Sequence, residues 1–250
     1  MITDPWFYAA AVPAVLLAGI SKGGFGHGAG MFATPLLALS VPIPQAAAIL
    51  LPPLIAMDLA GVWAYRHTFS REHLRLFLVG GLAGVALGAL CFGLFDEAVV
   101  RILLGAISIG FVMNRYLRRD AAQPAPRSVP KALFWSTISG VTTTLAHAGG
   151  PPLSVYLLPQ RLEKAVMVGT TVILFAVLNA VKVIPYAWLG LFRGDTLYTS
   201  FVLVPLAPVG IALGVVLMRR LPQETFYRAC YALLLVVGAK LLWDGATRLG

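Results

Sequence analysis

The sequence predicts an all-α polytopic membrane protein, and three features of its composition indicate this fold class. Hydrophobic residues make up 59% of the 250 residues and charged residues only 12%, about half of the roughly 25% found in soluble globular domains. Uninterrupted apolar stretches reach about 18 residues or more, the length that crosses a hydrocarbon core of about 30 Å. The 25 glycines and 17 prolines fall largely within these stretches, and both residues are more frequent in membrane helices than in soluble ones.

The apolar segments occur in the same order in each half of the chain. Each half begins with two short apolar segments separated by a glycine-rich break, which we predict to form a re-entrant-type helical hairpin, and three long transmembrane helices follow. In the first half the short segments are 5–21 and 31–40, and the long ones are 44–65, 74–95 and 98–117. In the second half the short segments are 132–146 and 151–158, and the long ones are 164–190, 196–218 and 225–247. The segment 5–21 is marginal in length for a complete crossing.

The two halves also share residues, which indicates an internal duplication. His27-Gly-Ala-Gly30 aligns with His147-Ala-Gly-Gly150, and Val85-Ala-Leu-Gly88 aligns with Ile211-Ala-Leu-Gly214. Self-similarity at a fixed spacing is the mark of a repeat. We therefore expect a first repeat, a polar linker and a second repeat, at 1–119, 120–130 and 131–250.

The basic residues predict how the chain is oriented in the membrane. With three long spans per half, most of the 19 lysines and arginines fall on the side of the central linker, and this side is therefore expected to be cytoplasmic. An odd number of crossings per half places equivalent loops on opposite sides, so that the loop at 66–75 lies inside and its counterpart at 193–195 lies outside. The two halves are then inverted repeats, the architecture of many secondary transporters.

Several classes of protein do not fit the sequence. The net charge of +9 does not indicate a nucleic-acid partner, because the basic residues lie at helix ends and not on one continuous face. Cys91 and Cys230 lie in apolar helical context, so we expect buried small hydrophobes and no disulfide. There is no HExxH, CxxC, Walker A or GxSxG motif. We therefore expect no metal, no cofactor and no enzymatic activity, and any transport would be passive or ion-driven unless a partner supplies energy.

The two glycine-rich breaks are the candidate substrate site. In inverted-repeat transporters, interrupted helices near the midplane supply this site. Glycine permits positive φ and close approach of a ligand to the backbone, and residues 28–31 and 149–152 would begin returning helices whose free N–H groups favour an anion. The alternative is that the glycines only allow helices to pack closely. The candidate substrate-binding residues are Lys22, Gly24, Gly26, His27, Gly28, Gly30, His147, Gly149 and Gly150.

Polar residues in the helices form a second set of candidates. Asp58 and Asn179 occupy equivalent positions in the two halves, 121 residues apart, and an ionisable group in a membrane helix is a functional candidate. Asp58 either carries a coupling proton or is the counter-ion of Lys22 or of a histidine. Lys182 lies on the same helix face as Asn179 and either faces the substrate or extends to the outer surface. Thr143 and Thr144 either offer hydroxyls to an anion or bond their own backbone carbonyls.

The motifs at the breaks resemble those of a known transporter family. Ser21-Lys-Gly-Gly-Phe-Gly-His-Gly-Ala-Gly30 with Thr34-Pro-Leu-Leu37, and Gly140 with His147-Ala-Gly-Gly-Pro-Pro152, resemble the two signatures of the sulfite exporter TauE/SafE family. The resemblance covers nearly the whole chain. It implies a bacterial inner-membrane transporter that works without ATP on sulfur-containing anions, and sulfite, sulfoacetate, thiosulfate and other sulfonates are the substrates associated with the family.

Together these observations predict a secondary transporter of small sulfur-containing anions, working by alternating access across the bacterial inner membrane with the central loop in the cytoplasm. Its expected partners are the anion, the lipid bilayer and, if transport is coupled, H+. The sequence leaves open the direction of transport, the coupling ion and whether the protein is a homo-oligomer. The alternatives are an uncoupled anion channel or facilitator, a proton-coupled carrier of small carboxylates, and a membrane-embedded enzyme or a sensor that transports nothing.

Overall fold

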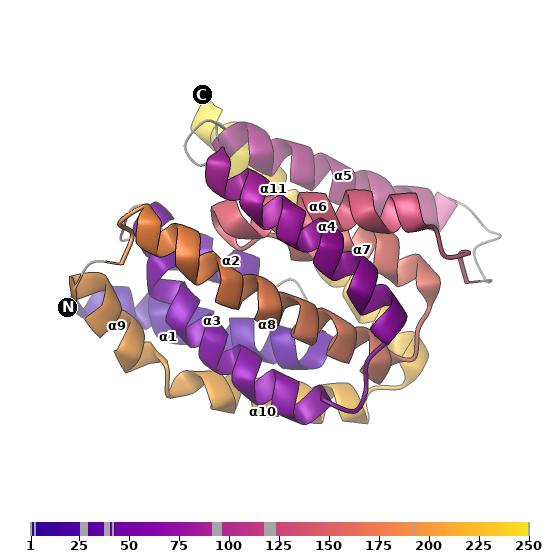
Figure 1. Ribbon diagram of the computed structural model, residues 1–250, viewed down its shortest axis with the longest axis horizontal. Helices are drawn as coiled ribbons and strands as arrows, with labels where there is room; N and C mark the ends of the chain where they lie inside the picture. Colours follow the sequence, from indigo (N-terminus) through magenta and orange to yellow (C-terminus); the bar gives the residue numbers. More distant parts are fainter. Residues whose placement is uncertain are drawn as a thin grey trace.

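The computed structural model describes residues 2, 4–25, 30–37, 41, 43–91, 97–117, 124–192 and 194–249, and in these ranges it contains helices and no strand (Figure 1). The first half contains α1 (Pro5–Phe25), α2 (Gly30–Leu37), α3 (Ile43–Tyr65), α4 (Arg71–Leu90) and α5 (Glu97–Leu117). The second half contains α6 (Val129–Ala146), α7 (Gly150–Leu157), η1 (Leu158–Gln160), α8 (Lys164–Trp188), α9 (Gly194–Leu203), α10 (Leu206–Arg220) and α11 (Gln223–Leu249). The predicted all-α class is confirmed.

Helices of membrane-spanning length occur throughout the chain. In the described ranges, 5 helices are long and apolar enough to cross a bilayer, namely α1, α3, α4, α8 and α11. The bent pair of α9 and α10 makes up to 6 if it crosses as one span. An ordinary soluble domain has no need for several such helices, so the predicted polytopic membrane protein is also confirmed.

The prediction of one continuous helix over 196–218 is wrong. The chain bends by 43° between α9 and α10, and the break falls at Val204 and Pro205. Pro205 has no N–H to donate to Phe201, four residues earlier, and its ring clashes with the Phe201 carbonyl. The neighbouring groups remain paired, because Val204 N–H donates to the Ser200 carbonyl at 3.1 Å. Pro205 therefore divides this span into two helices, and the Val204 N–H before it keeps a hydrogen-bond partner.

Helix α1 is longer than the predicted segment 5–21, and the expectation of marginal length is wrong. Its last turn includes Lys22 to Phe25, so the helix has 21 residues, enough to cross the hydrocarbon core. Lys22 and Gly24 therefore lie within a helix and not in the break after it. Helix α2 packs against α1, which is the arrangement that a hairpin requires.

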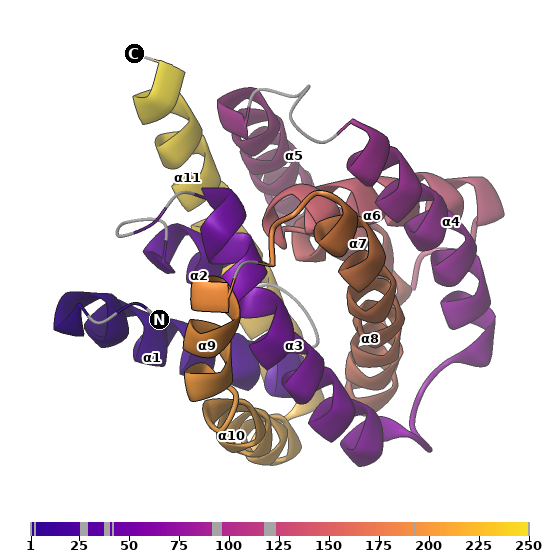
Figure 2. The ribbon, with the colours of Figure 1, turned by 60° about the vertical axis from the view of Figure 1, so that its left-hand side comes forward.

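The most extensive helix contacts join the first half of the chain to the second. Helix α1 packs on α10, α4 on α6, α5 on α11, and α3 on α8. In Figure 1, α4, α5, α6 and α11 lie together above, α1, α3, α9 and α10 lie below, and α8 runs between these groups. The view in Figure 2 shows α3 and α8 side by side in the middle of the molecule. The centre of the molecule is therefore built from both halves.

Glycines bring two of these helix pairs into close contact. A Cβ added at Gly19 of α1 would lie 2.8 Å from the Cα of Gly210 on α10, and one added at Gly84 of α4 would lie 2.8 Å from the Cα of Gly140 on α6. Only residues without a side chain allow backbones to approach this closely. Gly140 follows Gly19 by 121 residues and Gly210 follows Gly84 by 126, so the two contacts join equivalent positions of the two halves.

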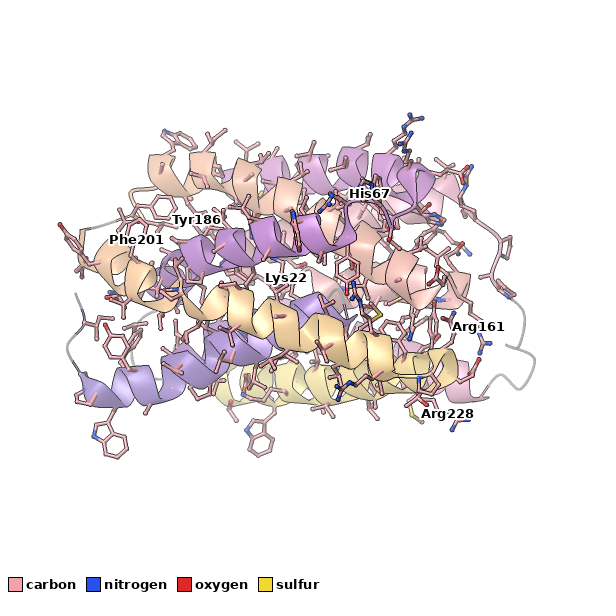
Figure 3. All side chains as sticks on the ribbon, turned by 90° about the horizontal axis from the view of Figure 1, so that it is seen from below. Lys22, His67, Arg161, Tyr186, Phe201 and Arg228 are labelled. Atoms are coloured by element: carbon pink, nitrogen blue, oxygen red, sulfur yellow. The ribbon has the colours of Figure 1, made fainter. Side chains whose placement is uncertain are left out.

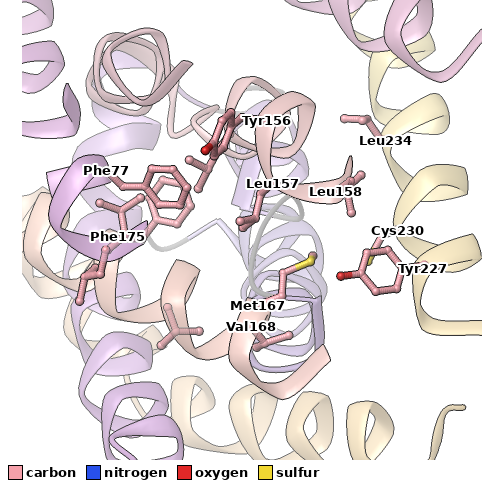
Figure 4. Packing of buried hydrophobic residues seen from close by; sticks show 14 of the residues in the cluster. Phe77, Tyr156, Leu157, Leu158, Met167, Val168, Phe175, Tyr227, Cys230 and Leu234 are labelled. Carbon is pink, nitrogen blue, oxygen red and sulfur yellow. The ribbon is translucent and has the colours of Figure 1, made fainter. Parts of the chain in front are cut away.

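Apolar side chains of α4, α7, α8 and α11 fill a core beside the short helix α7 (Figure 4). Leu157 and Met167 are completely buried there, and the rings of Phe77 and Tyr156 meet edge to face with centroids 5.7 Å apart. Close packing of this kind holds side chains in fixed positions. The core therefore anchors α7, and with it the break that precedes α7.

Candidate functional site

Buried polar side chains gather where α1, α3, α6 and α8 meet. In an apolar membrane interior such groups must pair with one another, and they mark functional sites. The set, which we call the central polar cluster, has members that are each at most 8% exposed: Lys22, Asp58, Thr143, His147, Asn179 and Lys182. Figure 3 shows Lys22 between the two ends of the molecule, with Tyr186 and Phe201 towards one end and Arg161 and Arg228 towards the other.

The first part of the cluster is a buried ion pair within the first half that a hydrogen bond joins to the second half. Lys22 Nζ lies 2.5 Å from Asp58 Oδ1 and 3.3 Å from the Leu54 carbonyl oxygen, to which it donates. Asn179 Nδ2 donates to the other carboxylate oxygen of Asp58 at 2.7 Å. Of the two predicted roles of Asp58, the structure shows that of counter-ion to Lys22. A role in proton coupling stays a prediction.

The second part of the cluster surrounds Lys182, which is 0% exposed and therefore does not extend to the outer surface. Its ammonium donates to the Thr143 carbonyl at 3.0 Å and to the Thr143 hydroxyl at 3.2 Å. It also lies 2.9 Å from His147 Nδ1, while His147 Nε2 lies 3.0 Å from the Ala47 carbonyl oxygen. Because an ammonium only donates and a carbonyl only accepts, this network assigns the tautomer of His147 with the proton on Nε2.

The cluster contains more lysines than carboxylates. Its members include two lysines, Lys22 and Lys182, and one carboxylate, Asp58, which pairs with Lys22. Lys182 contacts neutral groups, and no carboxylate in the described ranges lies within ion-pair distance of it. A buried cation without a counter-ion is costly, and a bound anion would offset this cost.

The break between α6 and α7 is a tight turn at His147. This residue has φ 51° and ψ 28°, the left-handed conformation, and it ends α6. Its N–H donates to the Thr143 carbonyl at 3.1 Å and the Ala148 N–H donates to the Thr142 carbonyl at 3.2 Å, so the end of α6 is capped. The left-handed conformation costs a residue with a side chain roughly 1–2 kcal/mol. Both ring nitrogens of His147 are bonded, which holds the residue in this strained position.

Gly149 and Gly150 lie at the start of α7 and have different roles. Gly149 has an ordinary φ of −72°, and a Cβ there would lie 2.8 Å from the Ser139 carbonyl oxygen, so this glycine serves close packing against α6. Gly150 begins α7 as predicted. Pro151 and Pro152 have no N–H, so within 149–152 only Gly149 and Gly150 have the N–H groups that the predicted anion site requires.

The two candidate threonines differ in their surroundings. Thr143 belongs to the cluster, because both its carbonyl and its hydroxyl accept from Lys182. Thr144 donates its hydroxyl to the Gly140 carbonyl at 2.8 Å, the backbone bond that is common for threonine in membrane helices. Thr144 is therefore a structural residue in this conformation.

The first break is described only at its edges. Three predicted site residues lie outside the described residues: Gly26, His27 and Gly28. A Cβ at Gly24 would lie 2.9 Å from the Gly214 carbonyl oxygen, so Gly24 serves the packing of α1 on α10. Gly30 begins α2. In the same helix the Thr34 hydroxyl is buried without a hydrogen-bond partner in the described structure, which is uncommon for a buried polar atom.

Two tyrosines that are not among the predicted site residues donate hydrogen bonds to the backbone near the ends of α1 and α6. Tyr65 OH donates to the Gly23 carbonyl at 2.6 Å, and Tyr186 OH donates to the Thr144 carbonyl at 2.8 Å. Tyr186 follows Tyr65 by 121 residues, and Thr144 follows Gly23 by the same interval. The same interval of 121 residues separates Asp58 of α3 from Asn179 of α8. It is the signal that could have identified both tyrosines.

Comparison with known families matches the chain to the model described as Sulfite exporter TauE/SafE, over residues 11–241. The match covers nearly the whole chain, including both breaks and every residue of the central polar cluster. No curated protein and no solved structure matches the chain.

Proposed function

Because the chain belongs to the sulfite exporter TauE/SafE family, we propose that it is a secondary transporter that binds a small sulfur-containing anion at the central polar cluster and moves it by alternating access. The family implies membrane transport of sulfur anions. The proposed substrates are sulfite, sulfoacetate, thiosulfate or other organosulfonates. The proposed location is the bacterial inner membrane, with the linker at 120–130 in the cytoplasm and H+ as the coupling ion.

The observation that carries this proposal is that Lys182 lies buried among the groups of Thr143 and His147 with no carboxylate partner in the described ranges. Its ammonium has three N–H donors, and they point to the Thr143 carbonyl, the Thr143 hydroxyl and His147 Nδ1. An incoming sulfur oxyanion can replace one of these neutral acceptors with a charged one, and charge-assisted hydrogen bonds are roughly twice as strong as neutral ones. A bound anion would therefore stabilise the cluster relative to the cluster without a ligand. A cation would not be bound there, because a protonated Lys182 would repel it.

Equivalent contacts in the two halves support an inverted repeat. The tyrosine bonds of Tyr65 and Tyr186 recur at an interval of 121 residues, and the glycine contact of α1 with α10 recurs in that of α6 with α4. A pair of equivalent contacts between halves is what a two-fold relation between them produces. Inverted halves that meet at a midplane site can rock against each other and expose that site to either side.

The ion pair gives a physical role to Asp58 in this cycle. Asp58 holds Lys22 of α1 and Asn179 of α8, so it connects helices of both halves. Protonation of the carboxylate would release Lys22 and leave a second cation free to face the anion. Uptake of a proton and binding of an anion would then favour each other, which is the linkage that proton-coupled transport needs.

Counterflow in proteoliposomes tests the proposed function. Vesicles preloaded with unlabelled sulfite should accumulate external labelled sulfite transiently, and protein-free vesicles should not. A carrier shows this counterflow and an uncoupled channel does not, whereas a carboxylate carrier would exchange acetate in preference to sulfite. The double variant His27→Ala/His147→Ala should lose most of the flux. Wild-type flux in this variant would contradict the proposed site, and absence of any sulfite counterflow would contradict the proposed function.

A further inference from the structure

A groove lies between α3 and α10 on the outer surface of the helix bundle, away from the central polar cluster. Its volume is about 600 Å³. Small residues such as Ala60 and Ala64 of α3 line one wall, and Ala212 and Val216 of α10 line the other. Both of these α10 residues are exposed, and both helices belong to candidate membrane spans. The groove therefore opens on the face that the bilayer would cover.

One end of this α3–α10 groove carries positive charge. Arg66 follows the last residue of α3, Arg219 lies in the last turn of α10, and both line the groove. Arg66 is held in place, because its Nη1 donates to the Trp63 carbonyl at 2.7 Å and its guanidinium carbon lies 5.1 Å from the centre of the Trp63 ring. Neither arginine has a carboxylate within ion-pair distance in the part of the chain that the structure describes. The groove thus offers two cations for an outside anionic group.

The length of the groove matches one leaflet of a bilayer. Its lining on α10 runs from Pro208 to Arg219, which corresponds to roughly 17 Å along a helix. Half of a hydrocarbon core is about 15 Å. Trp63 is 72% exposed beside the arginines, as is typical of tryptophan at the level of the lipid headgroups. An acyl chain in the groove would therefore place its headgroup beside the arginines.

We propose that the α3–α10 groove is a binding site for one anionic phospholipid, whose acyl chain lies along α10 and whose phosphate contacts Arg66 and Arg219. Basic pockets between membrane helices are suited to such headgroups. A free phosphate would leave the apolar walls uncovered, and a zwitterionic lipid would add a cation next to the two arginines. The site is independent of the proposed transport function, because no residue of the central polar cluster lines it.

Native mass spectrometry of the full-length protein in detergent tests this proposal. With phosphatidylglycerol the wild-type protein should show one retained lipid per chain. Phosphatidylcholine with the same acyl chains should be retained at least about tenfold less, and glycerol phosphate should not displace the bound lipid. Equal retention of the two lipids, or displacement by glycerol phosphate, would overturn the proposal.

Two pairs of variants separate the groove from the rest of the surface. Arg66→Gln/Arg219→Gln should weaken binding of phosphatidylglycerol about 30-fold, since each of the two basic residues contributes a factor of about five near a charged headgroup. Arg220→Gln on the same helix should change the binding little. Ala212→Trp, which fills the groove, should abolish retention, and Leu213→Trp, next to it but outside the groove, should not. Wild-type retention in the two groove variants would overturn the site. If the wild-type protein is a dimer and both groove variants dissociate it, a second copy of the chain occupies the groove. This result would also overturn the proposed lipid site.

Discussion

The two buried lysines of the central polar cluster are stabilised in different ways. Lys22 has Asp58 at 2.5 Å, whereas Lys182 has only a hydroxyl, a carbonyl and an imidazole. Their positions are not equivalent in the repeat, because the residue 121 positions after Lys22 is Thr143. Each half therefore supplies one lysine to the cluster, but from a different helix, and only Lys22 pairs with a carboxylate.

A double-mutant cycle on Lys22 and Asp58 tests the ion pair. We expect Lys22→Gln and Asp58→Asn each to lower the free energy of unfolding by about 3–5 kcal/mol, because each leaves the other charge buried without its partner. The double variant should be clearly more stable than either single variant. Thermal unfolding in detergent measures this, and additive losses in the double variant would show that the two groups are not coupled.

At the scale of elements, close contacts at glycines join helices of the first half to helices of the second half. Gly19 and Gly210 bring α1 against α10, and Gly84 and Gly140 bring α4 against α6. These contacts place the ends of α1 and α6, and hence Lys22 and the turn at His147, against the core formed by α3 and α8. The close contacts at these glycines therefore position the central polar cluster, although the glycines are not members of it.

Alanine substitutions of these glycines should destabilise the protein selectively. A Cβ at Gly84 or Gly210 would meet backbone atoms of the neighbouring helix, and overpacking of this kind costs about 1–3 kcal/mol. Gly110 of α5 is the matched control, because a Cβ there meets nothing within 4 Å. We expect Gly84→Ala and Gly210→Ala to lower the melting temperature, and Gly110→Ala to leave it unchanged or raise it slightly. Equal effects at all three positions would contradict the packing role.

At the scale of the whole molecule, the two proposed repeats share backbone contacts and differ in charge. The tyrosine bonds and the glycine contacts recur in both halves, whereas Asp58 in α3 corresponds to Asn179 in α8. An inverted pair of this kind would have two equivalent scaffolds around one asymmetric, positively charged centre. The asymmetry suits a transporter in which a single anion, and not one per half, occupies the site.

Labelling of single cysteines tests the inverted orientation. In a background with Cys91→Ser and Cys230→Ser, the exposed residues Arg71 and Asp195 can each be replaced by cysteine. These positions follow α3 and α8 and should lie on opposite sides of the membrane. A membrane-impermeant maleimide should label Asp195→Cys in intact cells and Arg71→Cys only after permeabilisation. Labelling of both from one side would mean that the halves are parallel.

Much of the fold could be predicted because apolar length and repeated order decide it. The boundaries of α3 and α8 follow directly from where their apolar stretches end. Pro205 indicates the bend between α9 and α10, and the prediction of one helix over 196–218 did not take this proline into account. The last turn of α1 could not be predicted from local sequence, because Lys22-Gly-Gly favours a break, and only the close packing of Gly24 on α10 explains why it is helical.

The candidate site could be predicted in its membership but not in its pairing. Asp58, Asn179, Lys182 and His147 were identifiable as polar residues in apolar helices. Which of them meet depends on how α1, α3, α6 and α8 pack, and this is a tertiary property. An anion site at the helix N-termini stays a prediction, and Pro151 and Pro152 leave fewer N–H donors at the start of α7 than the helix pattern alone implies.

The central claim is that Lys182 supplies the positive charge that holds a sulfur oxyanion between the two halves. Binding of labelled sulfite to the purified protein tests it, with Lys240→Met as the control because Lys240 forms an exposed pair with Asp244. We expect Lys182→Met to remain folded, since it removes a buried charge without a carboxylate partner, and to bind sulfite at least about tenfold more weakly. Lys240→Met should bind as the wild type does. Unchanged sulfite affinity in a folded Lys182→Met protein would contradict the claim.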